Sequence, residues 1–293
     1  MFSGSKIGRA AAWLALATAL VLTVFPFYWM VRTALTPAAA LYDGTTSLWP
    51  QGATLINFRR VLGLVGPEEA RAAGGSGAHI NFLRYTLNSV VYSGLIATVQ
   101  TFCCAMAGYA FARLRFPGRD LAFGIIIAAL MVPPIFTLLP NFVLAKQLGL
   151  LNTIPGLVLP SLLMTPFAVF FLRQFFLSIP REVEEAAMLE GVGPWGMFWR
   201  IVLPMSRGPL ITIALTTVVW SWKDYLWPLL VGKGEDTRVL TVGLGVFLQQ
   251  SPNRAPDWTG LMAGSVLSVV PVLLLLIFLG KRLVESLNFS GLK

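Results

Sequence analysis

The chain has 293 residues, of which 56% are hydrophobic and only 12% are charged, and its mean hydropathy is +0.73. Soluble domains carry about a quarter charged residues, so this composition excludes the soluble enzyme classes and indicates a membrane protein with several spans. The net charge of +9 does not indicate a nucleic-acid-binding protein, because the basic residues are spread along the chain. Anionic lipid headgroups and the excess of basic residues in cytoplasmic loops explain this charge more simply.

The first apolar segment, residues 10–31, contains no charged residue. As a helix it would be roughly 33 Å long, which is enough to cross the hydrocarbon core. It is longer than the apolar region of a signal peptide, so it predicts a retained first span. Residues 33–84 are expected to lie outside the membrane, where Gly74-Gly75-Ser76-Gly77 predicts a flexible insertion. We therefore expect residues 1–80 to form a first span and an extracytoplasmic loop, and residues 81–293 to form the transport core.

Residues 87–112 form the predicted second span, and Arg113, Arg115 and Arg119 follow it in a short loop. Such a density of arginine is typical of the cytoplasmic side. Cys103 and Cys104 lie in this span, and no second pair of ligands completes a metal site, so both are interpreted as packing residues. Residues 121–144 form the predicted third span. Its Pro133-Pro134 pair is expected to kink the helix, with neighbouring helices satisfying the freed carbonyls.

Three further spans are predicted at residues 156–176, 209–231 and 261–280, with an outer loop over residues 233–258. Basic residues are nearly balanced between the two sides, so the short arginine-rich loop decides the orientation. The sequence therefore predicts an all-α polytopic membrane protein with six transmembrane helices and both termini in the cytoplasm.

A long polar interruption, residues 180–206, separates the fourth and fifth spans. Its first part predicts a short helix from Pro180 to Leu189, because Glu182, Glu184 and Glu185 lie where the helix dipole favours carboxylates. Gly191 is expected to end this helix, and a second short helix is expected to start at Gly193-Pro194 and to stop at Pro204. From spacing alone, an amphipathic loop lying on lipid headgroups is an equally good interpretation.

This interruption resembles the signature loop of ABC importer permeases at every position of the pattern: Glu185, Ala186, Ala187, Gly191, Ile201, Leu203 and Pro204. The resemblance extends to the stretch from Ala107 to Arg113, to Met131-Val132-Pro133-Pro134 and to the stretch from Asp224 to Leu229. Over residues 81–293 the chain is similar to the maltose-type sugar permeases, the six-span members of the family of binding-protein-dependent transport inner-membrane components. The implied fold is that of a type I ABC importer permease.

The resemblance also implies a mechanism in which the permease performs no bond chemistry. In that family the loop is a coupling helix that docks on a separate ATP-hydrolysing subunit. Glu185 would contact that subunit, Ala186 and Ala187 would allow close packing, and Gly191 would set the turn. No phosphate-binding loop of the form G-x-x-x-x-G-K-[ST] occurs in the chain, so another chain would bind ATP and Mg.

The implied partners are a second homologous permease, two ATP-binding subunits, an extracytoplasmic solute-binding protein and membrane lipid, with no nucleic acid and no cofactor in this chain. The implied location is the bacterial cytoplasmic membrane. The implied cargo is a sugar or oligosaccharide, either neutral or anionic.

The chain differs from the family pattern at two places. Lys223 stands where the family commonly has asparagine, and Asn288-Phe289-Ser290 stand where the family has small residues, which leaves a contact between this tail and the ATPase open. A lysine within a span is costly unless it faces a water-filled path or a partner charge. One hypothesis is a substrate path at Lys223, Asp224, Trp222 and Tyr225; the alternatives are an ion pair or a lysine that reaches outward to the interface. Trp220, Trp222, Tyr225 and Trp227 also fit an interfacial aromatic belt.

A proton- or ion-coupled secondary transporter subunit is the main alternative function. Such carriers need carboxylates or histidines within the membrane, and here only Asp224 is a candidate. Six spans are also half the usual number for a carrier built from internal repeats.

Overall fold

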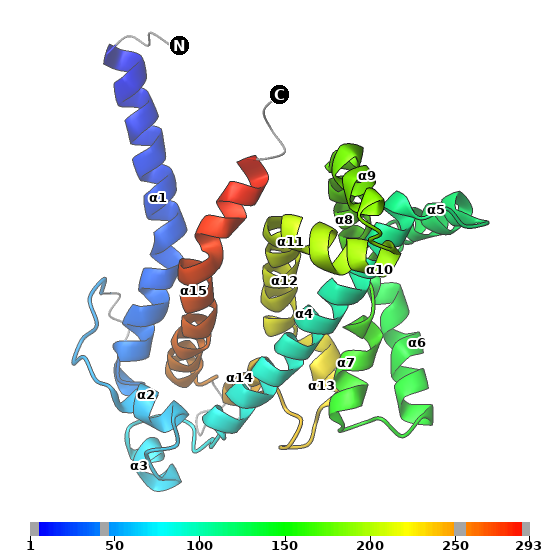
Figure 1. Ribbon diagram of the computed structural model, residues 1–293. Coiled ribbons are helices and arrows are strands. Elements are labelled where there is room, and N and C mark those ends of the chain that lie inside the picture. The colour runs from blue at the N-terminus through cyan, green and yellow to red at the C-terminus, as the bar shows by residue number, and fades with distance from the viewer. Residues whose placement is uncertain (1–5, 42–46, 249–255, 289–293) are drawn as a thin grey trace. The chain divides into compact units, whose positions relative to one another are not determined.

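The computed structural model describes residues 6–41, 47–248 and 256–288, and within these ranges every regular element is a helix. The chain forms two compact units. Unit 1 combines residues 1–83 with 243–271, and unit 2 combines residues 84–242 with 272–293. Figure 1 labels the helices that make up each unit.

Three helices are long and apolar enough to span a membrane without a break. They are α1 (Lys6–Leu35), α4 (Phe82–Arg113) and α15 (Trp258–Asn288), the last with its apolar part at Trp258–Gly280. Three bent helix pairs meet the same test, so the described residues hold six spans if each pair is one span. The prediction of an all-α membrane protein with six spans is confirmed in this sense. No side chain of residues 10–31 in α1 is buried, as expected for a helix in contact with lipid.

Unit 1 contains two short helices, α2 (Ile56–Val61) and α3 (Pro67–Ala72), and a buried polar network. The carboxylate of Asp257 pairs with Arg60, and one of its oxygens also accepts hydrogen bonds from Ser76 N and Ser76 Oγ, both at 2.7 Å. Its other oxygen accepts from Thr259 Oγ1 at 3.1 Å and from Gly260 N at 2.9 Å. The expectation of a flexible Gly74–Gly77 insertion is therefore wrong, because Ser76 is fully buried and anchored to this carboxylate.

The predicted outer loop over residues 233–258 is also more ordered than its composition suggests. It contains α14 (Leu240–Leu244) and a 3₁₀ turn (Gly245–Leu248). Val239 and Leu240 are buried in unit 2, and Phe247 is buried in unit 1.

The third span of the sequence analysis is broken more sharply than a kink. Helices α5 (Arg119–Ala129) and α6 (Pro134–Gln147) meet at 100°, and Pro133 precedes the first residue of α6 in an extended conformation. The break expected at Pro133-Pro134 is confirmed. Its size follows from the chain leaving the helix for four residues rather than bending within it.

The fourth span, expected to be continuous, is also broken. Helices α7 (Ile154–Leu162) and α8 (Pro166–Ser178) meet at 47°. Side chains of α4 take up the backbone groups at this break. Gln100 donates to the carbonyl of Ser161, Thr217 donates to Gln100 at 3.2 Å, and Thr165 N donates to Cys104 Sγ at 3.5 Å. Cys104 is fully buried, as the packing interpretation predicted, and it also binds backbone.

The fifth span differs from the predicted one. The third bent pair in the span count joins the helical segment Pro194–Met205 to the following helix at 77°. Helix α12 (Arg207–Trp222) ends at Lys223, and α13 (Leu226–Val231) starts after Tyr225. Lys223 and Asp224, expected to lie within this span, are both in the break between the two helices.

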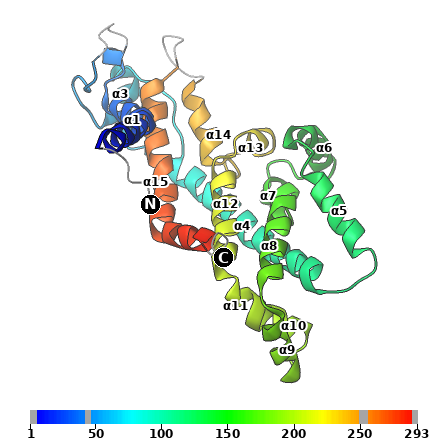
Figure 2. The ribbon, with the colours of Figure 1, turned by 90° about the horizontal axis from the view of Figure 1, so that it is seen from above.

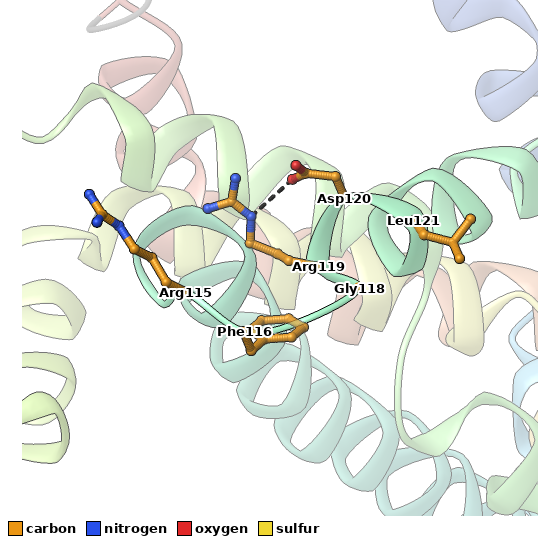
Figure 3. Close-up of a pocket in the computed structure, with 6 residues that line it drawn as sticks. All are labelled: Arg115, Phe116, Gly118, Arg119, Asp120 and Leu121. Atoms are coloured by element: carbon orange, nitrogen blue, oxygen red, sulfur yellow. Dashed lines mark hydrogen bonds and ion pairs between the residues drawn. The ribbon is translucent and has the colours of Figure 1, made fainter.

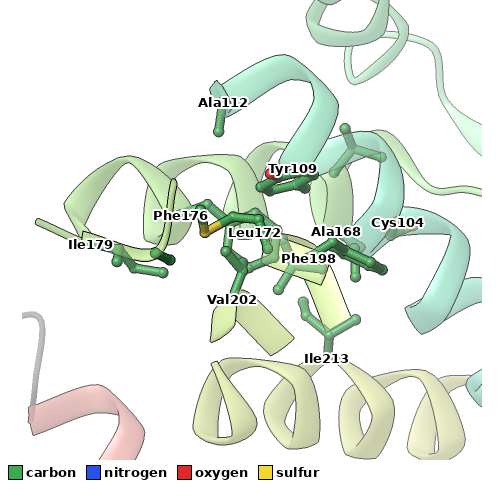
Figure 4. Packing of buried hydrophobic residues seen from close by; sticks show 14 residues of the cluster. Cys104, Tyr109, Ala112, Ala168, Leu172, Phe176, Ile179, Phe198, Val202 and Ile213 are labelled. Carbon is green, nitrogen blue, oxygen red and sulfur yellow. The ribbon is translucent and has the colours of Figure 1, made fainter. Parts of the chain in front are cut away.

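The larger core cluster of unit 2 joins α4, α8, the segment between α9 and α12, and α12 itself (Figure 4). Helices α4 and α8 approach closely at Gly108, where an added Cβ would lie 3.1 Å from Arg173 N and 3.2 Å from Leu172 Cβ. This cluster positions the candidate site.

Candidate functional site

The polar interruption, residues 180–206, is called the coupling segment here. Its first helix, α9 (Arg181–Leu189), agrees with the predicted helix to within one residue. The helix ends as expected at Gly191, which has φ +81° and whose N–H donates to Met188 O at 3.0 Å. Because a left-handed residue at this position favours glycine, Gly191 sets the direction in which the chain leaves α9. Figure 2 shows α9 and α10 at the end of unit 2 opposite to α6 and α13.

Helix α9 has one buried and one exposed face. Glu184 and Ala187 are each only 7% exposed and lie against the core. Glu185 and Ala186 are exposed, and Leu189 is 91% exposed. Ala187 was expected to allow close packing of a partner, and this part of the prediction is wrong: its small side chain lets α9 pack on its own core cluster.

The second half of the coupling segment is helical from Pro194 to Met205. It comprises α10 (Pro194–Gly196), a π-helical turn (Met197–Val202) and α11 (Leu203–Met205). Pro204 was expected to stop this helix, and the helix ends one residue later, at Met205, before a bend of 77° into α12. The N–H of Leu203 donates to Phe198 O, five residues back, and such a wider turn relieves the clash between a proline ring and the preceding turn.

The three residues of this half that match the signature-loop pattern differ in exposure. Ile201 and Leu203 are half-buried and pack against the core cluster, whereas Pro204 is exposed. Phe198 is buried there, with its ring 5.3 Å from that of Tyr109 on α4. Ile201 and Leu203 therefore fix the segment to its own chain, and of these three residues only Pro204 lies on the surface.

A buried arginine links the coupling segment to two spans. Arg113, the last residue of α4, places its Nε 2.7 Å from Glu184 Oε1. Its Nη2 donates to Phe176 O at 2.8 Å and to Ile179 O at 2.6 Å, at the end of α8. Both carbonyls lie at the C-terminal end of α8, where Phe176 O also accepts from Ile179 N at 3.3 Å, so one guanidinium joins α4, α8 and α9.

The carboxyl of Glu184 is in an unusual environment for a surface loop. Burial raises the pKa of Glu184 above its ordinary value, and the opposing effects of Arg113 and Arg181 do not cancel this. The sequence analysis missed the pair, because Arg113 was interpreted by its side of the membrane and Glu184 by its place in a helix. Nothing local in the sequence indicates a contact between residues so far apart.

A second ion pair near the same end of α4 is solvent-exposed. Arg119 Nε lies 2.9 Å from Asp120 Oδ1, and the Asp120 side chain is 84% exposed. The pair borders an open pocket of about 390 Å³ (Figure 3). The residues that line this pocket are Arg115, Phe116, Gly118, Arg119, Asp120 and Leu121.

The predicted substrate-path residues lie around the break between α12 and α13. Lys223 is exposed, with its Nζ 4.0 Å from the ring centroid of Trp220. Asp224 points elsewhere: its carboxylate accepts from Tyr92 Oη at 2.9 Å, and its carbonyl accepts from Thr241 Oγ1 at 2.7 Å. Tyr225 is exposed and Trp222 is half-buried. The break thus separates an exposed ammonium group, which lies over the Trp220 ring, from a carboxylate that is hydrogen-bonded to Tyr92.

No cluster of three or more metal-ligating side chains occurs among the residues that the structure describes. The altered tail, Asn288-Phe289-Ser290, lies outside the described side chains, so its contact with an ATPase stays an open question.

Comparison with known proteins now decides the family. A model of the binding-protein-dependent transport system inner membrane component matches residues 105–289. The chain belongs to this family. The match begins within α4 and covers the whole coupling segment, so the resemblance seen in the sequence is confirmed. Members of the family are permease subunits of ABC importers, and this chain is one of them rather than an enzyme.

Several curated permeases are similar over most or all of the chain. The probable ABC transporter permease protein YurM of Bacillus subtilis is 29% identical over 98% of this chain and 89% of its own length. The arabinooligosaccharides permease AraQ of Halalkalibacterium halodurans is 35% identical over 70% of this chain and 72% of its own. The trehalose permease SugB of Mycobacterium tuberculosis is 30% identical over 97% and 98%.

Among solved structures, a chain of a bacterial ABC transporter that imports the acidic polysaccharide alginate has the same fold. The TM-score is 0.76 and the identity 22%, over 96% of this chain and 99% of the other.

Proposed function

We propose that this permease moves a carbohydrate across the cytoplasmic membrane and that its coupling segment docks on a separate ATP-binding subunit. The observation that supports docking is the division of α9 into two faces. Glu184 and Ala187 fix the helix to its own core, while Glu185, Ala186 and Leu189 are left exposed on a helix held in place. A preorganised surface of this kind suits a partner, because little ordering entropy is lost on binding.

A carbohydrate cargo is supported by the relatives, whose names specify arabinooligosaccharides, diacetylchitobiose and trehalose. Another relative, the permease UgpE of Brucella abortus, is named for sn-glycerol-3-phosphate and is 28% identical over 98% of both chains. The cargo is therefore a sugar or a sugar-like polar molecule, and an anionic one is included in this range.

The proposed assembly contains a second homologous permease, two ATP-binding subunits that hold ATP and Mg, and an extracytoplasmic solute-binding protein. The coupling segment and the arginine-rich loop after α4 lie at the same end of unit 2 (Figures 1 and 2). If the arginines mark the cytoplasmic side, the coupling segment is cytoplasmic too, and six spans place both termini there.

The docking role is tested by Gly191→Val and Glu185→Lys in a complex reconstituted with its ATP-binding subunits. Valine at φ +81° costs about 1–2 kcal/mol in that conformation, so the exit from α9 should change. Lysine at position 185 reverses an exposed charge on the docking face. We expect both variants to insert into the membrane and to lose most of the ATP hydrolysis that is stimulated by the loaded binding protein.

The matched control for the glycine is Gly193→Val. Gly193 has φ −74°, and an added Cβ meets no atom within 4 Å at either glycine, so only the backbone conformation differs. The control should keep stimulated hydrolysis. Normal stimulation in both Gly191→Val and Glu185→Lys would refute docking, and uptake by a complex without any nucleotide subunit would favour the secondary transporter instead.

We also propose that Lys223 lines the substrate path and favours anionic cargo. It is exposed, no acidic side chain among the described residues pairs with it, and its neighbour Asp224 is bound to Tyr92. Lys223→Asn should therefore lower the uptake of an acidic saccharide relative to a neutral one of the same length, with Lys233→Asn, in the following loop, as the control. If Lys223→Asn does not change the ratio of acidic to neutral saccharide uptake in proteoliposomes, Lys223 does not select for anionic cargo.

A further inference from the structure

We propose that Arg113 is the joint through which movement of the coupling segment reaches the membrane spans, with Glu184 as its partner on α9. This inference rests on the proposed docking function and adds the route by which docking acts on α4 and α8. Arg113 and Glu184 are positioning residues in this scheme, because neither is on the exposed docking face.

The first support is the geometry of the guanidinium. Two of its contacts go to backbone carbonyls of Phe176 and Ile179, and the third goes to the carboxylate of Glu184. The guanidinium is planar and presents its donors in a fixed fork. A displacement of Glu184 is therefore transmitted to α8 and α4 together, unless one of these contacts breaks.

The second support is burial. The side chains of Arg113 and Glu184 are 7% and 9% exposed, so water does not screen the pair. Removing one partner of a buried pair leaves the other charge uncompensated, which makes partial separation costly. The pair is therefore expected to stay closed while the coupling segment moves, as a rigid link between helices requires.

The third support is a second attachment one turn earlier on α4. Tyr109 donates to Pro194 O at 3.5 Å, and its ring packs on Phe198 of the π-helical turn. Arg113 thus holds the first half of the coupling segment, and Tyr109 holds the second half. Both halves are fixed to one face of the same span, four residues apart, so they move with α4 as one body.

The two adjacent glutamates have separate tasks in this arrangement. Successive residues on a helix point about 100° apart. Glu185 faces outward and Glu184 inward. Glu184→Gln removes the inner charge with almost no change of shape. Arg113 keeps the carbonyls of Phe176 and Ile179 as acceptors in this variant, so the protein is expected to fold and insert.

The experiment uses the full complex in nanodiscs and compares Glu184→Gln, Arg113→Lys and the double variant. Assembly with the ATP-binding subunit and basal ATP hydrolysis should stay near wild type. The ratio of stimulated to basal hydrolysis should fall about tenfold in each single variant. The double variant should be no worse than the singles, because both changes break one joint.

The matched controls are Asp120→Asn and Arg119→Lys, which make the same chemical changes in the exposed pair at the start of α5. Exposed pairs contribute little, so these controls should keep the wild-type ratio. A wild-type ratio in Glu184→Gln, or effects that multiply in the double variant, would overturn the inference.

The outcome is distinguishable from a failure of docking. If Gly191→Val abolishes stimulation while Glu184→Gln does not, docking stands and the joint is refuted. If Gly191→Val and Glu185→Lys both leave stimulation normal, docking itself fails. Should Arg113→Lys not assemble, Glu184→Gln alone decides.

Discussion

Asp257 is the most completely bound carboxylate in unit 1. Burial alone would raise the pKa of Asp257, but Arg60 and the donors on Gly260 and Ser76 together hold it below its ordinary value. The ionised form is therefore favoured by folding. Its stabilising effect is present above the ordinary pKa of about 4 and is lost as the pH falls through the lower, folded-state pKa.

Asp257→Asn should consequently destabilise the protein at neutral pH, by about 3 kcal/mol, because Arg60 is left buried without its counter-charge. The difference from wild type should shrink as the pH falls below about 4, since wild type then loses the same charge. Unfolding in detergent at several pH values measures this. Asp236→Asn, in the exposed pair with Arg84, should change stability by less than about 1 kcal/mol. A deficit of Asp257→Asn that does not vary with pH would contradict the argument.

Neither buried ion pair could be predicted from the sequence. Arg60 lies in the segment 33–84, which was predicted only to be outside the membrane. Asp257 lies in the predicted outer loop, whose polar composition indicates a solvated segment. Their partners are set by tertiary contacts between residues distant in the chain, which periodicity and spacing do not report. A buried pair in a polar loop has the same local sequence as a solvated one.

At the scale of the helix, the residues that interrupt a span determine its shape more than its hydropathy does. The break before Pro134 was predictable, because two consecutive prolines leave no helical alternative. The break at residues 163–165 was not predictable, since a single proline such as Pro166 either kinks a helix or begins a new one. The presence of Gln100 and Cys104 on α4, which bind the freed backbone groups, decides between these outcomes.

Gln100→Leu tests this explanation of the fourth span. Leucine is similar in size but cannot bind Ser161 O or Thr217, so the break should open more often. A lost hydrogen bond between membrane helices is worth about 1 kcal/mol, which corresponds to roughly a fivefold change in an equilibrium. With Cys103 replaced by serine, a membrane-permeant maleimide should modify the buried Cys104 about fivefold faster than in the parent.

The control for this measurement is Thr98→Val, on the exposed side of the same helix. Its labelling rate should equal that of the parent protein. An unchanged rate in Gln100→Leu would show that the hydrogen bonds do not hold the break closed.

The coupling segment was the element best predicted from sequence, because its signals are local. Acidic residues in the first turn, Gly191 at the end and a proline at the start of the next helix specify α9 and α10 without reference to the rest of the chain. The π-helical turn before Pro204 was not predicted, since it leaves no signal in composition.

At the scale of the whole molecule, hydropathy and the signature-loop motif were sufficient to predict the class of protein. A fold shared at 22% identity with a TM-score of 0.76 is understandable, because lipid-facing positions need only be apolar. The constrained positions are those that join helices, such as Gly108, where α4 and α8 approach closely. The secondary transporter is the weaker alternative, since Asp224, its one candidate relay, is hydrogen-bonded to Tyr92.

The ion pair between Arg113 and Glu184 has a consequence for building hybrid permeases. Residues 180–206 form a short continuous segment, so exchanging them alone is the obvious way to make a permease dock on a different ATP-binding subunit. Their inner face is matched to a cation 71 positions upstream. A graft without Arg113 would place Glu184 in a foreign permease without its buried counter-charge. The smallest exchangeable part therefore includes the end of α4.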